Sequence, residues 1–292
     1  MKILVTGSSG FFGSTIVRLL GSDSIFTLNR NIGNFQYDLS QSIPEFNEDF
    51  DIVIHNAGKA HGFLRTETEK DSFFQVNIQG TKNLLQGLEK IILKQFVFIS
   101  SVSVYGLEYG INVDEQAFLN AKDSYGLSKI RAERIVIDWC KKNSVVCTIL
   151  RLPLLVGKNP PGNLGIMLNG IKKGYYFNIG GGKAKKSMVL AEDVVRFIPM
   201  VARFGGIYNL TDGVHPSFSA LSNAIAKNRV KNLPLCFAKI LGLLGDIFGE
   251  KAIINSNKVR KITSDLTFDD SKAREMGWRS QSVLEYLKVN YL

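Results

Sequence analysis

Tyr125 and Lys129 lie four residues apart in the stretch SYGLSKIRAERIV, residues 124–136. On a helix, residues four apart share one face, so the lysine is expected beside the tyrosine. A nearby ammonium group favours the phenolate and therefore lowers the pKa of the phenol. Moving that pKa from about 10 towards 7 takes roughly 4 kcal/mol of differential stabilisation. The pair is a candidate for proton exchange with a substrate hydroxyl, although the same spacing occurs on ordinary helices.

A cluster of serines comes before this pair, in the stretch ISSVSVYG at residues 99–106. The apolar run ahead of it predicts a strand, and ligands of open α/β sheets bind at the carboxyl ends of strands. Ser100, Ser101 and Ser103 could each orient a reacting oxygen. Ordinary hydrogen bonding at the end of a strand is the alternative.

Three glycines follow the first apolar run of the chain in VTGSSGFFG, residues 5–13. Gly7 permits a tight turn, Gly10 lets the backbone approach a pyrophosphate, and Gly13 allows close packing of helix on sheet. The N-terminus of the helix then offers free N–H groups to an anion. This spacing, directly between a predicted strand and helix, indicates dinucleotide binding rather than a simple turn.

The end of the second predicted strand bears on the choice of dinucleotide. An acidic residue there would hydrogen-bond the ribose 2′-OH and repel a 2′-phosphate. Asn29 and Arg30 stand there instead, and arginine pairs well with phosphate. We therefore expect NADP, with NAD left open. Asp38 is placed to accept a hydrogen bond from the adenine amino group, or else to stabilise a turn.

Short apolar runs alternate with helical patterns through the first half of the chain. Strands are predicted at residues 2–7, 24–30, 51–58, 95–101 and 145–153, and helices at 14–20, 71–90 and 123–140. Nearly all-apolar strands separated by helices indicate a parallel sheet buried on both faces. We expect an α/β fold with a Rossmann-type doubly wound parallel sheet. Its NAD(P)-binding domain would span residues 1–155 with later returning segments, and a smaller mixed α/β substrate lobe would take up most of 156–292.

The composition is that of an ordinary globular domain, 45% hydrophobic and 21% charged over 292 residues. No apolar run reaches the roughly 18 residues typical of a membrane span. Because TGSSG interrupts the apolar N-terminus, we expect no signal peptide and a cytoplasmic protein. The scattered cysteines and histidines indicate neither a disulfide framework nor a metal site. The net charge of +10 favours an anionic metabolite as partner over nucleic acid, because no nucleic-acid-binding motif accompanies it.

Two later stretches stand out. The basic, glycine-rich run at residues 172–186 is expected to be a loop. The stretch LPLCFAKILGLLGDIFG at residues 233–249 predicts a helix that is apolar on several sides. Such a helix either packs inside the lobe, which we favour, or contacts a membrane surface or a second subunit.

These motifs together resemble the extended short-chain dehydrogenase/reductases, the NAD-dependent epimerase/dehydratase family that acts on nucleotide sugars. The resemblance runs along nearly the whole chain. It rests on TGSSGFFG, HNAG, VNIQGT, FISSVSVYG, YGLSK and RLPLLVG in the family's order, with KKSMVLAEDVV and FDDSKAREMGW later. It implies a homodimer formed through the two long helices of the sheet domain.

The resemblance also implies roles for individual residues. Ser101 would be the catalytic hydroxyl beside Tyr125 and Lys129, with the cofactor's positive nicotinamide ring supplying part of the phenol's pKa shift. The remaining cofactor-binding positions it implies are Phe11, Phe12, Leu39, Ala57, Gly58, Lys59 and Asn77, of which Asn77 supports the active-site helix. For the substrate it implies Ser101, Asn163, Lys186 and Arg260, although Lys186 stands where arginine is more usual in the family.

Three reactions share such a site. A 4,6-dehydratase of this family carries an Asp-Glu pair after the catalytic hydroxyl, whereas Val102 and Ser103 follow Ser101. A 4-epimerase oxidises and re-reduces sugar carbon four with retained NAD. A 4-keto reductase delivers hydride once, usually from NADPH, and a nucleotide 4-keto-6-deoxy-(N-acetyl)hexosamine would be its substrate. Asn29, Arg30 and the C-terminal stretch favour the reductase slightly. A non-catalytic dinucleotide-binding sensor or scaffold is the alternative of another class.

Overall fold

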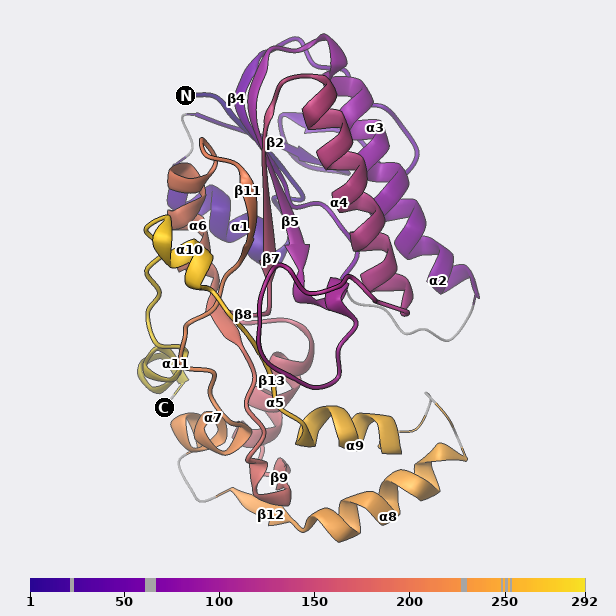
Figure 1. Cartoon of the computed structure of the whole chain (residues 1–292), viewed down its shortest axis with the longest axis vertical. Coiled ribbons are helices and arrows are strands. Elements are labelled where there is room, and N and C mark those ends of the chain that lie inside the picture. The colour runs from indigo at the N-terminus through magenta and orange to yellow at the C-terminus, as the bar shows by residue number, and fades with distance from the viewer. Residues whose placement is uncertain are drawn as a thin grey trace.

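A seven-stranded parallel sheet forms the centre of the computed structural model, which describes residues 1–21, 24–60, 67–226, 230–247, 249, 252 and 254–291. The strands lie in the order β11-β7-β5-β4-β1-β2-β3 (Figure 1). Their bounds are β1 Ile3–Thr6, β2 Ile25–Asn29, β3 Phe35–Gln36, β4 Phe50–His55, β5 Leu93–Ser101, β7 Val146–Leu152 and β11 Gly206–Asn209. The chain runs outward from β1 to β3 and then returns to place β4 on the other side of β1. This reversal of strand order creates the switch point where ligands bind in such sheets.

Helices cover both faces of the sheet. On one face α1 (Phe11–Leu20) lies beside α6 (Ala191–Val201), and on the other α3 (Gly80–Gly87) lies beside α4 (Ser124–Lys142). Each face has its own apolar core, because side chains alternate between the two faces along every strand. In β1, for example, Val5 packs towards α1 and Leu4 packs towards α3. The predicted doubly wound α/β fold is confirmed.

The predicted helix at residues 71–90 has an internal irregularity. It consists of α2 (Glu67–Phe74), a π-helical turn at Gln75–Gln79, α3 and a short 3₁₀ turn at Leu88–Lys90. Such π-turns often occur at functional positions. This one carries Asn77, whose side chain is buried between the helix and the sheet.

The second half of the chain contributes to the large sheet and also builds outside it. Both β11 and α6 belong to the sheet layers, as the expected returning segments. Three two-stranded sheets lie outside: β8 (Leu154–Val156) with β10 (Met188–Leu190), β9 (Phe177–Ile179) with β12 (Lys231–Leu233), and β6 (Gly110–Val113) with β13 (Leu266–Phe268). Figure 1 shows them below the sheet with the remaining helices, except α10 (Ser271–Glu275), which contacts β11 of the large sheet. The remaining helices are α5 Gly162–Lys172, α7 Phe218–Ile225, α8 Leu235–Asp246, α9 Ser256–Thr263 and α11 Val283–Tyr291.

Two expectations for this half are wrong in part. The basic glycine-rich run is not all loop, because residues 177–179 form β9 and pair with β12. The apolar stretch at 233–249 does form a helix, α8, but its large side chains do not pack inside the lobe; most of those described are exposed. No helix among the described residues is long and apolar enough to cross a membrane.

Candidate active site

The carboxyl ends of β1, β4 and β5 bring most of the predicted site together. β1 leads into the glycine-rich loop, β4 into Ala57, Gly58 and Lys59, and β5 into Ser101. Because β4 and β5 are neighbouring parallel strands, these segments meet at one edge of the sheet. The N-terminal turn of α4 supplies Tyr125 there. Asp123 caps this helix, since its Oδ1 accepts a hydrogen bond from the N–H of Gly126 at 3.0 Å.

The side chains of Ser101 and Tyr125 lie next to each other, close enough for the serine hydroxyl to lower the pKa of the tyrosine. Ser101 is the last residue of β5, and its hydroxyl donates to the Ser103 hydroxyl at 3.1 Å. The N–H of Ser103 donates back to Ser101 Oγ at 3.2 Å. Ser100, the third candidate, is buried on the opposite side of the strand, where its hydroxyl donates to Glu133 at 2.5 Å. The structure therefore separates the three serines, and of these only Ser101 influences the pKa of the tyrosine.

The expected lowering of the Tyr125 pKa by Lys129 is wrong for this arrangement. Burial of the phenol, in contact with the ring of Phe73 at a centroid distance of 6.1 Å, raises the pKa of Tyr125. The Ser101 hydroxyl lowers that pKa, and the nearby carboxylate of Asp123 raises it further. Desolvation disfavours the charged phenolate, and Lys129 is not among the groups that shift this pKa.

Lys129 instead faces the sheet below the tyrosine. Its Nζ donates a hydrogen bond to the carbonyl oxygen of Ile99 at 2.7 Å and lies 4.4 Å from the ring centroid of Phe98. The side chain is buried, and burial lowers the pKa of Lys129 to about 8, although the carboxylate of Glu133 raises it. Near neutral pH Lys129 therefore remains protonated, and its positive charge is buried away from water.

Asn77 connects the loop after β4 to the active-site helix. Its Oδ1 accepts from the backbone N–H of Lys59 at 2.7 Å, and its Nδ2 donates to the carbonyl of Lys59 at 3.0 Å and to Ser128 Oγ at 2.8 Å. A Cβ on Gly58 would approach Asn77 Oδ1 to 3.1 Å and Lys129 Nζ to 3.7 Å. The Nζ of Lys59 donates to Ser72 Oγ at 2.6 Å and lies 5.2 Å from the ring centroid of Phe73.

The glycine-rich loop fits a dinucleotide's pyrophosphate. Gly7 has φ +66°, and a Cβ there would approach Ala57 to 2.8 Å, whereas a Cβ on Gly13 would lie 2.1 Å from the carbonyl of Gly7. Gly10 has no such crowding; its nearest neighbour would lie at 3.5 Å. No acidic residue stands in the first turn of α1 to repel an anion. The loop is thus compact at Gly7 and Gly13 and open at Gly10, where a phosphate would approach.

Two of the implied cofactor positions turn their side chains elsewhere. Phe12 and Leu39 are buried in the two cores of the sheet. Each can therefore offer a ligand only its backbone. Phe11 is half-buried and packs near Gly157, where a Cβ would lie 3.1 Å from its ring.

Asn29 is tied to the glycine-rich loop rather than left free. Its Nδ2 donates to Ser8 Oγ at 2.5 Å, and its Oδ1 accepts from the N–H of Ser9 at 3.2 Å. The neighbouring Arg30 is exposed, and no acidic side chain of the described segments pairs with it. The amide thus shapes the loop, while the guanidinium is the group available to a ligand.

Asp38 stabilises its own turn. Its Oδ1 accepts hydrogen bonds from the N–H of Ser40 at 3.0 Å and from the Ser40 hydroxyl at 2.6 Å. This is the structural role that remained open for this residue. A contact to an adenine amino group would have to use the other carboxylate oxygen.

The three residues implied for the substrate in addition to Ser101 lie far from the tyrosine in the sequence and on separate elements. Asn163 is exposed in the first turn of α5, and Lys186 is half-buried where the chain pairs with Leu266. Burial lowers the pKa of Lys186, and Asp265 raises it. Arg260, on α9, forms an ion pair with Glu108 at 2.5 Å. No contact joins these three side chains to one another or to Tyr125 in the part of the chain that the structure describes.

Behind the site lies a buried ion pair that the motifs did not reveal. Arg151 on β7 forms a two-pronged pair with Glu133 on α4, with Nη2 to Oε2 at 2.8 Å and Nε to Oε1 at 3.1 Å. Arg151 Nη1 also donates to Tyr105 OH at 3.1 Å, and that hydroxyl donates to Asn209 on β11 at 2.8 Å. Glu133 follows Lys129 by one helical turn. No sequence signal links partners 18 or more residues apart, so only the fold identifies this network.

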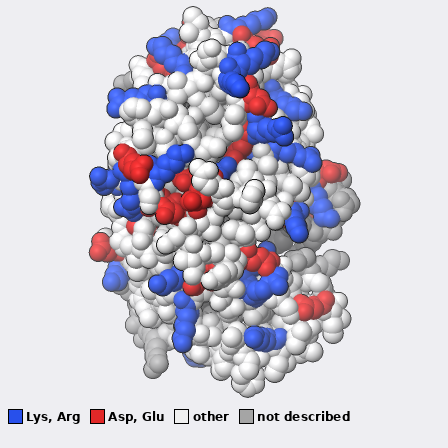
Figure 2. All heavy atoms as spheres, viewed as in Figure 1, with Lys and Arg blue, Asp and Glu red and all other residues white. Residues whose placement is uncertain are grey.

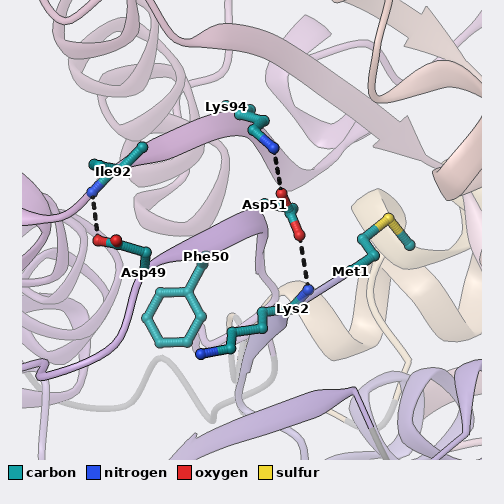
Figure 3. Close-up of a pocket in the computed structure, with 7 residues that line it drawn as sticks. All are labelled: Met1, Lys2, Asp49, Phe50, Asp51, Ile92 and Lys94. Atoms are coloured by element: carbon teal, nitrogen blue, oxygen red, sulfur yellow. Dashed lines mark hydrogen bonds and ion pairs between the residues drawn. The ribbon is translucent and has the colours of Figure 1, made fainter.

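A surface hollow lies at the other end of the sheet (Figure 3). It is lined at the amino ends of β1, β4 and β5 by Met1, Lys2, Asp49, Phe50, Asp51, Ile92 and Lys94. Lys94 Nζ pairs with Asp51 at 2.6 Å across it. Because parallel strands all point away from this end, none of the predicted site residues lies there.

The basic side chains are scattered over the face seen in Figure 2 rather than gathered into one stripe.

The sheet, the glycine-rich loop and the serine–tyrosine–lysine set at the ends of β1, β4 and β5 are those of the extended short-chain dehydrogenase/reductases. The model of the NAD dependent epimerase/dehydratase family matches residues 3–211, so the chain belongs to this family of enzymes.

Named relatives agree with this assignment. The chain is 28% identical to an N-acetyl-alpha-D-glucosaminyl-diphospho-ditrans,octacis-undecaprenol 4-epimerase of Escherichia coli O157:H7, over 95% of this chain and 90% of the relative. A UDP-glucuronic acid 4-epimerase from Bacillus cereus, solved with UDP-glucuronic acid and NAD, is 20% identical with TM-score 0.75, covering 100% of this chain and 98% of that one. RMD from Pseudomonas aeruginosa, solved with NADPH, is 19% identical with TM-score 0.74, covering 99% and 97%. The structural neighbours therefore bind NAD in one case and NADPH in the other.

Proposed function

We propose that this enzyme transfers hydride at carbon four of a sugar linked to a diphosphate, and that its reaction is 4-epimerisation. The observation that supports hydride chemistry is the approach of the Ser101 hydroxyl to Tyr125, with Lys129 buried below the tyrosine. The similarity to a 4-epimerase over 95% of the chain supports epimerisation. The diphosphate carrier would be a nucleoside, as in the UDP-sugar epimerase of similar fold, or a polyprenol, as in the Escherichia coli relative.

The protein's own groups would divide the work as follows. Ser101 would hold the oxygen on sugar carbon four, and Tyr125 would take the proton from that oxygen and return it. Lys129 would keep a positive charge below the reacting groups and hold the nicotinamide ribose. Asn77 would fix the loop at Lys59 against the active-site helix through its three hydrogen bonds. A bound nicotinamide dinucleotide would supply the hydride acceptor and donor.

Reduction of a 4-keto sugar is the second candidate, and one observation favours it. Asn29 and Arg30 offer no carboxylate against a 2′-phosphate, and Arg30 is exposed and available to one. We therefore propose NADP as the cofactor of the reductase and NAD as that of the epimerase.

For the substrate side we propose that most of residues 156–292 forms the binding lobe. Asn163 and Lys186 would donate hydrogen bonds to the diphosphate. Arg260 could do so only by exchanging its partner Glu108 for the ligand. We further propose a homodimer through α4 and the helical segment before it, at residues 67–90.

Replacing Tyr125 tests the catalytic assignment. In Tyr125→Phe, removal of the hydroxyl should lower kcat by about 10²–10⁴-fold, the usual contribution of a positioned acid–base group. The assay would follow interconversion of UDP-N-acetylglucosamine and UDP-glucose with their 4-epimers by NMR. Binding of NAD and NADPH should be retained. Tyr175→Phe, a change at an exposed tyrosine, is the matched control and should leave kcat unchanged.

Unaltered turnover in Tyr125→Phe would refute the assignment of Tyr125 as the acid–base group. An unmodified protein that binds NAD or NADPH but turns over none of these sugars would favour the non-catalytic dinucleotide-binding module. The cofactor released on denaturation separates the two reactions. Tightly held NAD with turnover in the absence of added cofactor supports the epimerase. An enzyme that binds NADPH reversibly and consumes it with a nucleotide 4-keto-6-deoxy-N-acetylhexosamine, without epimerising UDP-sugars, would replace it with the reductase.

A further inference from the structure

Helix α8 packs on the rest of the protein through its smallest residues. The buried residues of this helix are Ala238, Gly242 and Gly245, spaced four and three apart along one face. A Cβ on Gly242 would lie 3.2 Å from the backbone of Ser256, and one on Gly245 would lie 1.8 Å from the carbonyl oxygen of Ile254. Through these small residues the helix is held tightly against the segment that leads into α9 and against Val259 of α9, whose Cγ2 would lie 3.3 Å from a Cβ on Gly242.

The large apolar side chains of the same helix face outward. Successive residues of a helix are 100° apart, so the side of α8 opposite its buried residues can be read from the sequence. An arc of about 160° on this side contains no charged residue. Around the helix the arc runs from Leu243 to Leu241 and includes Ile247, just after the helix. Its large apolar side chains are between 44% and 78% exposed. Its members are Cys236, Phe237, Ile240, Leu241, Leu243, Leu244 and Ile247. We call these residues the α8 apolar face. So many exposed large apolar side chains on one helix mark a contact surface.

Basic residues surround the α8 apolar face. Lys239 lies on the flank of α8, Lys231 on the strand before it, and Lys261 on α9, which packs against α8. Arg260, also on α9, is already paired with Glu108. The acidic residue of α8, Asp246, is already engaged by the N–H and hydroxyl of Ser256, at 2.9 and 2.6 Å. Figure 1 places α8 at the lower edge of the molecule, far from the amino ends of the sheet strands. An apolar helix face with a basic border is the pattern of helices that lie in the interface of an anionic membrane.

We propose that the α8 apolar face docks on the surface of an anionic phospholipid bilayer, with the helix axis in the plane of the membrane. Twelve residues rise about 18 Å at 1.5 Å each, too short to span the hydrocarbon core. Charge favours a bilayer over a second copy of this chain as the occupant. A two-fold contact across α8 would bring the basic borders of two copies together, whereas anionic head groups attract them. This inference does not depend on the proposed function.

Flotation of the full-length protein with lipid vesicles tests the proposal. The protein should float with phosphatidylcholine vesicles containing about 30% phosphatidylglycerol, and less so with pure phosphatidylcholine or at high salt, because the basic border adds a screened attraction. In the triple variant Ile240→Ser, Leu243→Ser, Leu244→Ser the constant for partition of the protein onto vesicles should fall more than about tenfold. The reason is that the membrane contact loses three large apolar side chains.

The matched control replaces three exposed apolar residues outside α8 with serine. Ile92→Ser, Phe204→Ser and Val289→Ser alter side chains that are at least as exposed as Ile240 but lie outside α8. This variant should float like the unmodified protein. Equal loss of flotation in both triple variants would show that general surface hydrophobicity is responsible, and would overturn the proposal.

Cys236 provides a second readout that needs no disruptive substitution. It is exposed on the α8 apolar face, whereas Cys140 is buried and Cys147 half-buried. An environment-sensitive fluorophore on Cys236 should shift to shorter wavelength when phosphatidylglycerol vesicles are added. An unshifted probe in vesicle-bound protein would place another surface at the membrane. An absence of vesicle binding, together with a dimer that becomes monomeric in the α8 triple variant, would identify α8 as a subunit contact and refute the proposal.

Discussion

At the scale of single residues, burial sets the behaviour of the titratable groups around the site. Loss of water raises the pKa of Tyr125 and lowers that of Lys129, so it favours the neutral form of both side chains. The Ser101 hydroxyl opposes this shift for Tyr125. His55 shows the same effect most strongly. It sits beneath the loop after β4, where Nδ1 lies 2.8 Å from Thr6 Oγ1 and Nε2 lies 2.9 Å from Thr81 Oγ1. Both ring nitrogens are therefore engaged by hydroxyls, and the ring has a structural role.

His55 should make the fold sensitive to acid. Burial and the nearby Lys129 lower the pKa of His55 to about 3, while an unfolded histidine has a pKa near 6.5. Between these values the unfolded chain binds a proton that the native state does not, so the free energy of unfolding falls as pH falls from 6.5 towards 3. At pH 5 the loss from this group is on the order of 2 kcal/mol. Urea unfolding at pH 7 and pH 5 measures it.

The matched variant is His55→Gln, which cannot titrate but can still hydrogen-bond both threonines. Its free energy of unfolding should lose about 2 kcal/mol less than that of the unmodified protein between pH 7 and pH 5. Parallel losses in the two proteins would mean that the acid sensitivity comes from other groups.

At the scale of elements, the turn between β1 and α1 combines a packing requirement with a binding requirement. Its glycines are not equivalent. A Cβ on Gly13 would lie 2.1 Å from the carbonyl oxygen of Gly7, far too close, whereas a Cβ on Gly10 would lie 3.5 Å from the same oxygen, an ordinary contact. The sequence pattern indicated both roles, but the spacing alone could not show how much room each position has.

Alanine substitutions should separate the two roles. Gly13→Ala forces α1 away from the loop and should lower the free energy of unfolding by about 1–3 kcal/mol, the range for overpacking. Gly10→Ala should leave stability nearly unchanged but weaken NAD and NADPH binding about tenfold or more, because the added methyl group occupies the approach to the pyrophosphate. Urea unfolding and fluorescence titration would measure these effects. Gly10→Ala with undiminished affinity would contradict the predicted pyrophosphate site.

At the scale of the whole molecule, the last part of the chain returns to the core of the first. Trp278, in the C-terminal segment, is fully buried, with its ring 5.2 Å from that of Phe197 on α6. Its Nε1 donates to the carbonyl of Thr211 at 3.0 Å, just after β11. Tyr105 accepts a hydrogen bond from Arg151 and donates one to Asn209 on the same strand, β11. Strand β11 is therefore also linked to the residues behind the active site. The two halves of the sequence are therefore interleaved.

Truncating this contact should destabilise the sheet layers themselves. We expect Trp278→Ala to lower the free energy of unfolding by about 3–5 kcal/mol, the usual cost of removing a large buried aromatic side chain. Val289→Ala, at an 84% exposed position of the same C-terminal region, should change it by less than about 0.5 kcal/mol. Circular dichroism during urea unfolding would report both. A loss below about 1 kcal/mol in Trp278→Ala would show that the C-terminal segment is a separate, weakly attached unit.

The sequence by itself determined the α/β class, most elements of the sheet domain, the glycine-rich turn and the candidate set of Ser101, Tyr125 and Lys129. These depend on hydrophobic periodicity and on spacings of a few residues, which short-range geometry translates directly into strands, turns and helix faces. It also placed the family motifs in order along the chain.

Only the tertiary structure decided which groups meet and how much water they keep. It separated Ser101 from Ser100, turned Lys129 towards Ile99, raised the pKa of Tyr125 and exposed the large side chains of α8. Each of these outcomes depends on partners contributed by other parts of the fold. Desolvation and packing are properties of the assembled fold, since they arise from all neighbours in space, and local sequence patterns do not specify those neighbours.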